Sequence, residues 1–315
     1  MIWSITQIAQ AIAGNQESKA VYGSFQLALW DQQHSIGVGR DASGKQVLVL
    51  PSDSQVAAFD KKYASFSPLV SAEVRGEETV SGIYAILECK FDVSNPNEAK
   101  TLAGVFSGLL EVNETFGSAG LSIWAMKRIF EHGLLAPDPQ NLTGLIGELS
   151  VIAASPVKAL MVEAWHSQND SVYDFSWNNK RVEVKTTKSP IRHHHFSSNQ
   201  LPGPSNTSVS IASVSLMVTE IGQTLSDLYA TVISGLPLPL VEKVSRLVID
   251  TIGVPASAVS EPIFDSQGTI ASVLFFDSLD IPQPEYPIGV LSVEWKSDLS
   301  GLQPISPNFL EDSKF

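Results

Sequence analysis

The chain has 315 residues, of which 43% are hydrophobic and 17% are charged, and its formal net charge is −13. This length and hydrophobic content suffice for one large or two modest cores, which excludes a disordered chain. The single cysteine, Cys89, excludes an intramolecular disulfide and a metal site made of several thiolates. The N-terminus lacks a basic segment before an apolar run, and no apolar stretch reaches 18 residues, so we expect a cytoplasmic protein without a membrane partner.

The first half of the chain alternates between short apolar runs and turn residues. Its patterns predict a helix over 2–13, a strand-rich region over 20–92, a helix over 96–112, and a helix that follows a break near Gly117 and ends at Glu131. The proline-containing loop 136–139 then separates this last helix from the next one.

The second half has the order helix, strand, strand, strand, helix. The predicted elements are a helix over 141–154, strands over 172–177, 181–187 and 208–218, and a helix over 221–234. A linker at 235–239 leads to an amphipathic helix over 241–252 and to strands near 270–276 and 289–295. We expect an α/β (α+β) protein with a strand-rich N-terminal region (1–117), a core (118–235) and a C-terminal helix plus strands (236–315).

The segment from Asp174 to Lys185 has the pattern of a hairpin with charged residues on one face. Glu183 and Lys185 are two residues apart in a β-branched run, so strand alternation points both side chains out of the same face. Asn178 and Asn179 separate this run from the preceding one, and asparagine tolerates the left-handed conformations of tight turns. Two antiparallel strands are therefore expected to bring an Asp, a Glu and a Lys together.

These residue types suit phosphodiester hydrolysis. The reaction needs a hard cation that neutralises phosphate oxygens and lowers the pKa of the attacking water, and Mg²⁺ prefers a few carboxylate oxygens with several waters retained. Asp174 and Glu183 fit that ligand set, and Lys185 would bind the water or balance charge in the transition state.

A second Glu-x-Lys copy, Glu88 and Lys90, provides a comparison within the chain. No strand with a Tyr-Asp-Phe pattern precedes this copy, and Glu77 and Glu78 lie beyond a Ser-Gly break. We therefore predict that Glu88 and Lys90 form the solvated face of a strand.

Glu148 is a candidate for a third carboxylate at the same site. It lies beside the apolar stripe of the predicted helix 141–154, which Asn141 or Thr143 can cap. Gly144 and Gly147 are costly inside a helix unless another element approaches closely.

The residues around the hairpin are basic, although the chain is acidic. Residues 175–219 contain five basic residues and one acid, a net charge of +4, whereas the remainder contains 15 basic and 32 acidic residues. A phosphate-binding surface and a chance solvated face both remain open, and the overall charge predicts weak DNA affinity or a partner that delivers the DNA. The candidate DNA contacts are Lys180, Lys188, Arg192, His194, His195 and Gln200.

The triple histidine at 193–195 does not have the spacing of a zinc site. Consecutive residues on a strand point to alternate faces, and no Cys or spaced His pair completes a tetrahedral ligand set. A loop whose imidazoles meet phosphates and a merely structural loop both remain open.

Several of these motifs together resemble the PD-(D/E)XK superfamily of restriction-endonuclease-like nucleases. The matching residues are Gly144-Leu-Ile-Gly-Glu148, Asp174, Glu183-Val-Lys185-Thr-Thr187, His194-His-Phe-Ser197 and Gln200-Leu201. More narrowly, this segment of about 141–201 resembles a bacterial family known as "PD-(D/E)XK motif protein", which implies a role in restriction-modification or phage defence. The resemblance implies a restriction-endonuclease-like core with a mixed central sheet flanked by helices, and strand-rich additions at both ends.

The segment also departs from the superfamily in two places. Tyr173 stands where the name-giving proline would precede Asp174, and no tyrosine follows Gln200 at the spacing of recombination-type exonucleases. The second departure argues against the recombination-type exonuclease subtype.

The sequence thus predicts a Mg²⁺-dependent endodeoxyribonuclease, with Mn²⁺ as an alternative metal. Asp174, Glu183, the Val184 carbonyl and Glu148 would hold the metal, and Lys185 would orient or activate water. The expected partners are DNA and proteins of a restriction or defence system, and a homodimer is compatible with this reading. The alternative is a catalytically silent nuclease fold that binds DNA or partner proteins, which the low overall basicity would suit.

Overall fold

The computed structural model forms two compact units, each of which draws on two stretches of the chain. It describes residues 3–14, 23–52, 57–76, 78–90, 99, 102–110, 137–167, 172–201, 206–285, 287 and 289–306. The first unit comprises 1–137 and 245–259, and the second comprises 138–244 and 260–315. Because the division falls within helix α7 (Leu238–Ile252), this helix contributes residues to both units.

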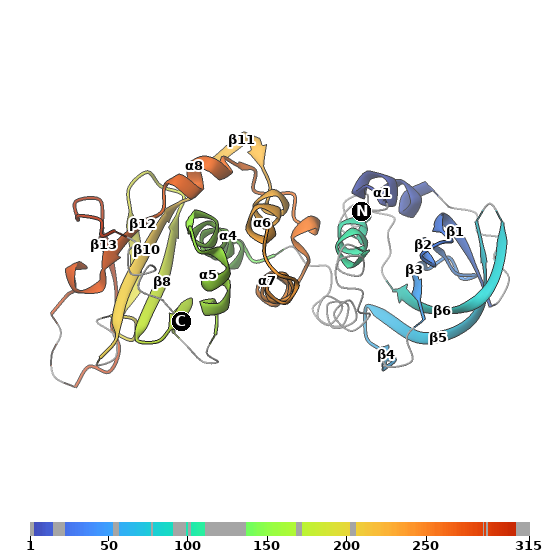
Figure 1. The fold of residues 1–315 in the computed structure, drawn as a ribbon, viewed down its shortest axis with the longest axis horizontal. Coiled ribbons are helices and arrows are strands. Elements are labelled where there is room, and N and C mark those ends of the chain that lie inside the picture. The colour runs from blue at the N-terminus through green and yellow to red at the C-terminus, as the bar shows by residue number, and fades with distance from the viewer. Residues whose placement is uncertain are drawn as a thin grey trace. The chain divides into compact units, whose positions relative to one another are not determined.

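The first unit contains a six-stranded sheet that closes on itself (Figure 1). Its strands are β1 (Ser24–Asp31), β2 (Ile36–Arg40), β3 (Gln46–Pro51), β4 (Phe59–Asp60), β5 (Ala64–Arg75) and β6 (Thr79–Cys89). Their order is β1-β2-β3-β6-β5-β4, and β1 also pairs in parallel with β5. The closed sheet surrounds an apolar cluster that includes Phe25, Val47, Val74 and Ile86, so the predicted strand-rich region is confirmed.

The described helices of the first unit agree with the helices predicted from the sequence. Helix α1 (Ile5–Gly14) lies against β1 and β2, and the Ile12 carbonyl near its end accepts hydrogen bonds from Arg40 and Gln46. Residues 102–110 are helical, as predicted. The predicted break near Gly117 and the helix ending at Glu131 lie outside the described residues.

The second unit is built on a four-stranded mixed sheet. Its strands are β7 (Phe175–Trp177), β8 (Lys180–Thr187), β10 (Ser208–Ser215) and β12 (Leu274–Asp277), in the order β12-β10-β8-β7. The central strands β8 and β10 are parallel, and both outer strands pair antiparallel to their neighbours. Asn178 has a φ of 47° in the turn between β7 and β8, as its hairpin role predicts. The sheet takes β12 from residues 236–315, a region that the sequence alone assigns to a C-terminal addition.

Helices cover one face of this sheet. Helix α4 (Pro139–Ala154) packs against β8 and β10, with α5 (Lys158–Ala164), α6 (Leu225–Ile233) and α8 (Ser266–Ala271) beside it (Figure 1). On the opposite face, a two-stranded sheet of β9 (His193–Ser197) and β13 (Glu294–Asp298) shares a buried cluster with β10 and β12. This cluster contains Tyr173, Phe196, Leu201, Val209, Ile211, Phe276, Ile281 and Leu299. The arrangement is the mixed α+β core expected from the sequence.

Several element boundaries differ from the sequence prediction. Asp138, rather than Asn141 or Thr143, caps α4, because its carboxylate accepts hydrogen bonds from the amides of residues 140 and 141. The hairpin strand begins at Phe175 rather than at 172. Residues 218–223 form strand β11 ahead of α6, and residues 266–271 form α8 ahead of β12. Apolar periodicity cannot locate such ends, because caps and short tertiary pairings set them.

The close approach of α4 to β8 accounts for one of the two helix glycines. A methyl group on Gly147 would lie 1.8 Å from Thr186 Oγ1 and 3.3 Å from Val184 Cγ1, whereas one on Gly144 would meet only the flexible Glu148 side chain, at 3.9 Å. Gly147 therefore lets the helix sit close enough to the strand for Glu148 to reach the charged residues of the sheet.

We expect Gly147→Ala to lower the free energy of unfolding by about 1–3 kcal/mol, because the added methyl group overpacks the contact between α4 and β8. Gly144→Ala is the matched control and should be neutral or slightly stabilising, since alanine is the better helix former. Urea unfolding followed by circular dichroism measures both changes. Equal losses in the two variants would contradict this account of the packing.

Candidate active site

Asp174 is fixed at the start of the hairpin by the neighbouring strand. Its Oδ2 accepts a hydrogen bond of 2.7 Å from the Val184 amide. Burial raises the pKa of the Asp174 carboxyl well above its ordinary value, and the negative charges of Glu148 and Glu183 raise it further. One oxygen of Asp174 lies within 4.8 Å of one oxygen of Glu148, whereas Glu183 is outside that group and is linked to Asp174 through the amide of the next residue, Val184. Val184, whose carbonyl is a predicted metal ligand, also contacts the site through its amide.

Glu183 and Lys185 point out of the same face of β8, as strand alternation predicts. Lys185 Nζ lies 2.8 Å from Glu183 Oε1, and Gln200 Nε2 donates a 2.5 Å hydrogen bond to the same oxygen. Lys185 Nζ also donates to Gln200 Oε1 at 3.2 Å, so the three side chains form a closed triangle. Gln200 thus orients Glu183 and Lys185. The sequence analysis instead predicts that Gln200 contacts DNA.

The second oxygen of Glu183 has no partner among the described residues. Glu183 is only 6% exposed, and its Oε2 is buried without a hydrogen bond. Burial raises the pKa of Glu183, the charge of Glu148 adds to the rise, and Lys185 opposes it. A buried carboxylate oxygen without a donor is costly unless a cation or an ordered water satisfies it.

Glu148 reaches the site from α4 and meets two residues that the sequence analysis did not identify. Trp165 Nε1 donates a 2.6 Å hydrogen bond to Glu148 Oε2, and His166 Nε2 lies 3.1 Å from the same oxygen. One ligand atom from each of Glu148, His166 and Asp174 lies within 4.8 Å of the others. No local pattern marks His166, because it follows α5 in an irregular segment and reaches the acids only through the tertiary fold.

The predicted DNA contacts fall into two groups. Lys188 and His195 are exposed, and Lys180 is partly exposed at the start of β8. His194 is only 3% exposed and lies 2.7 Å from Ser213 Oγ, so its side chain does not reach a surface ligand. This placement is a correction, and its cause is the pairing of β9 with β13, which buries alternate residues of the triple-histidine strand.

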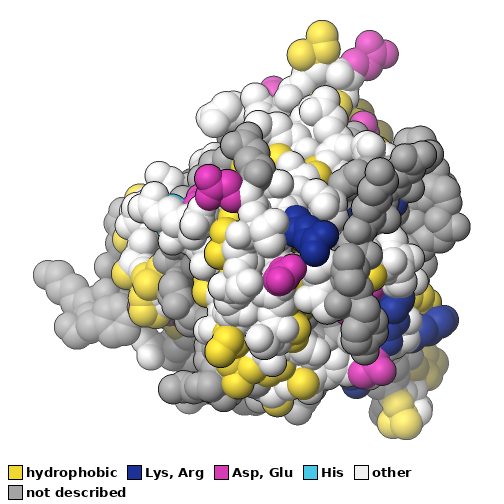
Figure 2. Space-filling view, turned by 90° about the vertical axis from the view of Figure 1, so that its right-hand side faces the viewer, with side chains coloured by type: hydrophobic (Ala, Val, Ile, Leu, Met, Phe, Trp, Pro, Cys, Tyr) yellow, Lys and Arg dark blue, Asp and Glu magenta, His cyan; other side chains and the backbone are white. Residues whose placement is uncertain are grey.

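Arg192 is also committed within the protein. Its guanidinium donates to the Ser213 carbonyl and hydroxyl, both at 2.8 Å, and to the Ser272 carbonyl at 2.6 Å. It therefore joins β10 to the end of α8, and its predicted phosphate contact is corrected to a structural role. Figure 2 looks onto the first unit, where the lysine and arginine side chains of the described residues lie among acidic ones; this view does not show the face of β8.

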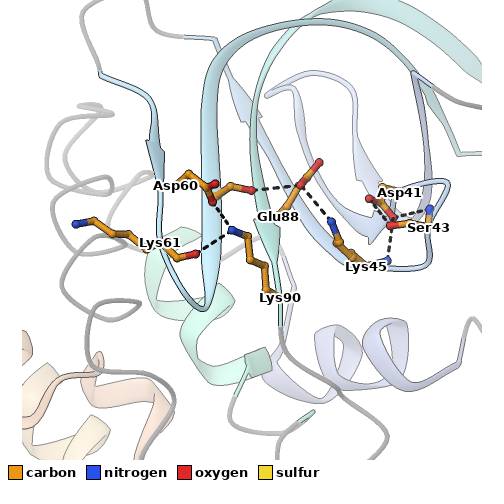
Figure 3. Close-up of polar contacts among 8 residues, drawn as sticks. Asp41, Ser43, Lys45, Asp60, Lys61, Glu88 and Lys90 are labelled. Atoms are coloured by element: carbon orange, nitrogen blue, oxygen red, sulfur yellow. Dashed lines mark hydrogen bonds and ion pairs between the residues drawn. The ribbon is translucent and has the colours of Figure 1, made fainter.

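The second Glu-x-Lys copy has a different arrangement. Figure 3 shows Glu88 pointing toward Lys45, which lies 4.0 Å away, while Lys90 binds Asp60 and the Lys61 carbonyl. The side chain of Glu88 is 33% exposed, which agrees with the predicted solvated face. The short strand β4 does supply an acid ahead of this copy, which the sequence analysis did not anticipate. Because Lys90 pairs with that acid rather than with Glu88, the copy lacks the triangle found on β8.

Comparison with known proteins identifies one family. A family model described as "Putative PD-(D/E)XK family member (DUF4420)" matches residues 31–251, more than two thirds of the chain. Neither the curated proteins nor the solved structures contain a significant match. Among the described residues, no helix combines the length and apolar character that a membrane span requires.

The structural role of Arg192 predicts that its replacement lowers the stability of the fold, whereas replacement of an exposed basic residue does not. We expect Arg192→Ala to lower the free energy of unfolding by about 1–3 kcal/mol or more, because two buried carbonyls lose their donor. Lys188→Ala is the exposed basic control and should leave the unfolding midpoint unchanged. Chemical denaturation of the two variants measures the difference, and an unchanged midpoint for Arg192→Ala would contradict the structural role.

Proposed function

We propose that this chain, which belongs to the PD-(D/E)XK family, is a metal-dependent endodeoxyribonuclease that hydrolyses DNA phosphodiester bonds. The observation that carries the proposal is that Glu148 and Asp174 present oxygens within 4.8 Å of each other, while the Val184 amide links Asp174 to the strand that bears the buried Glu183–Lys185 pair. A DNA endonuclease suits restriction or phage defence, as the resemblance of segment 141–201 implies, with DNA and defence-system proteins as partners.

The residues fit a divalent metal. Burying several carboxylates together is unfavourable without a compensating cation, and the pKa values of Asp174 and Glu183 are raised accordingly. The unpartnered Oε2 of Glu183 is a donor atom available to an ion. Asp174, Glu183, Glu148 and the Val184 carbonyl would hold Mg²⁺, or Mn²⁺ in its place. When bound, the metal would neutralise phosphate charge and lower the pKa of the attacking water.

The chain's own residues then have separate tasks. Lys185 presents a preorganised ammonium group, which would hydrogen-bond the attacking water or balance charge on the phosphate. Gln200 binds both Glu183 and Lys185, and so keeps the lysine at the acid when no substrate is present. Trp165 fixes the Glu148 carboxylate through its indole N–H. Lys180, Lys188 and His195 remain the proposed contacts to DNA.

A second candidate function is a catalytically silent nuclease fold that binds DNA or a partner protein. The specific observation in its favour is that at least three of the five basic residues in segment 175–219 bind groups within the protein. Lys185 pairs with Glu183, Arg192 donates to Ser213 and Ser272, and Arg181 donates to the carbonyls of Asn178 and Lys180. The net charge of −13 points the same way. Cleavage of supercoiled plasmid separates the two candidates, because the silent subunit predicts no nicking with either metal.

We expect Lys185→Ala to abolish the nicking of supercoiled plasmid in Mg²⁺ or Mn²⁺ while leaving the circular dichroism spectrum intact. The reason is that Lys185 is assigned to the water and the phosphate rather than to a core. Lys90→Ala, in the other Glu-x-Lys copy, is the matched control and should retain activity. Equal loss of cleavage in the two variants would show that the wrong copy has been assigned.

The paired acids should also oppose DNA binding when no metal is present. The double variant Asp174→Asn with Glu183→Gln replaces both carboxyl groups by neutral amides on the face proposed to receive phosphate. It should abolish cleavage yet bind DNA in EDTA at least as tightly as the unmodified protein. Affinity should fall as salt rises, because lysines still meet phosphates.

A gel-shift titration in EDTA at two salt concentrations measures both effects. The two substitutions keep the size of each side chain. The thermal unfolding midpoint of the double variant checks that any loss of DNA binding is not caused by unfolding. Weaker binding by a folded double variant, or affinity independent of salt, would favour the silent subunit over the nuclease.

A further inference from the structure

The imidazole of His166 introduces a different kind of ligand beside the acids. One nitrogen of its ring, one oxygen of Glu148 and one oxygen of Asp174 all lie within 4.8 Å of one another. The three residues come from different places: α4, the segment after α5, and the segment before β7. No hydrophobic pattern demands a histidine here, and its side chain is 37% exposed, so it is not a core residue.

The surrounding protein holds all three groups in place. Trp165, which is fully buried, fixes Glu148 through its 2.6 Å hydrogen bond. The Val184 amide fixes Asp174, and the His166 amide donates a 2.8 Å hydrogen bond to the Asp174 carbonyl. His166 has a φ of 43°, a left-handed conformation that few non-glycine residues adopt. Backbone held in such a conformation concentrates at functional sites.

A buried oxygen beside these residues is a second, independent observation that points to a ligand. The Asp174 carboxylate is hydrogen-bonded to the amide of Val184, the residue after Glu183, and the buried Oε2 of Glu183 has no hydrogen-bond partner among the described residues. The neighbourhood therefore contains a buried carboxylate oxygen without a donor in addition to the three clustered ligands. A cation that enters among these residues would satisfy that oxygen.

We propose that His166 is a metal ligand and that, with Glu148 and Asp174, it makes this site selective for a divalent transition-metal ion over Mg²⁺. The proposal rests on the metal-dependent function proposed above. Mg²⁺ takes oxygen ligands, whereas imidazole suits first-row transition-metal ions such as Fe²⁺, Ni²⁺ and Zn²⁺; Mn²⁺ is the weakest binder of that series and therefore gives the most stringent comparison with Mg²⁺. The competing explanation is that His166 only pairs with Glu148, from which it lies 3.1 Å, and has no effect on metal preference.

The test is a comparison of metal affinities in the full chain without DNA. Binding of Mn²⁺ is followed by the electron paramagnetic resonance signal of the free ion, and Mg²⁺ affinity is obtained by displacement of Mn²⁺. The main variant is His166→Asn, because asparagine tolerates the left-handed backbone and replaces the ring nitrogen with a hard amide oxygen. We expect Mn²⁺ affinity to fall at least about tenfold while Mg²⁺ affinity changes little.

Two controls separate ligation from positioning. Trp165→Phe keeps the imidazole but removes the donor that holds Glu148, so it should weaken both metals by a similar factor and leave their ratio unchanged. His195→Ala removes an exposed imidazole on β9 and should change neither affinity. Circular dichroism checks that each variant is folded, and His166→Gln serves as a second substitution.

The outcomes distinguish the inference from the proposed function. If the unmodified protein binds neither Mn²⁺ nor Mg²⁺, the metal-dependent function and this inference fail together. If it binds both and the folded His166 variants keep the same Mn²⁺ to Mg²⁺ ratio, the selectivity role of His166 is overturned and the proposed nuclease stands. A lower ratio in the His166 variants alone supports the inference.

Discussion

The hydrogen bond from the Val184 amide to the Asp174 carboxylate is the contact on which the site depends. It ties the segment before β7 to the middle of β8, so that Asp174 faces Glu183 on the neighbouring strand. The same segment accepts the His166 amide at the Asp174 carbonyl. Because α4 approaches β8 closely at Gly147, Glu148 reaches the same place from the helix layer. Asp174, on the short segment before β7, therefore lies close to residues of β8, of α4 and of the segment after α5.

Holding several carboxylates together is electrostatically unfavourable, and this is the property expected of a site that binds a cation. Three carboxylates near one another, with the pKa values of Asp174 and Glu183 raised, are held together by Lys185, Gln200 and Trp165 rather than by mutual attraction. Such a site is expected to gain stability when a cation binds. The first unit has a superficially similar pair in Glu88 and Lys90, but these two residues bind separate partners, and the described residues around them do not form a group of acids with the spacing of metal ligands.

Local pattern predicts the part of the site that lies on regular elements. Alternation along β8 is sufficient to place Glu183 and Lys185 on one face, and the asparagine turn predicts the hairpin that leads back to Asp174. Local pattern does not predict the positions of residues that are fixed by contacts with segments far away in the sequence. His194 and Arg192 are turned inward because β9 pairs with β13, about 100 residues later, and because Arg192 binds Ser213 and Ser272. His166 and Trp165 sit between elements, where no periodicity applies.

The most direct measurement of the central claim is the location of Mn²⁺ by anomalous scattering in crystals of the full chain. The account predicts a peak within coordination distance, roughly 2.0–2.3 Å, of carboxylate oxygens of Asp174 and Glu183, with Glu148 nearby. The Oε2 of Glu183 should be among the ligands. The absence of a peak there at saturating Mn²⁺, with Glu183 still bound only to Lys185 and Gln200, would contradict the claim that these acids form a metal site.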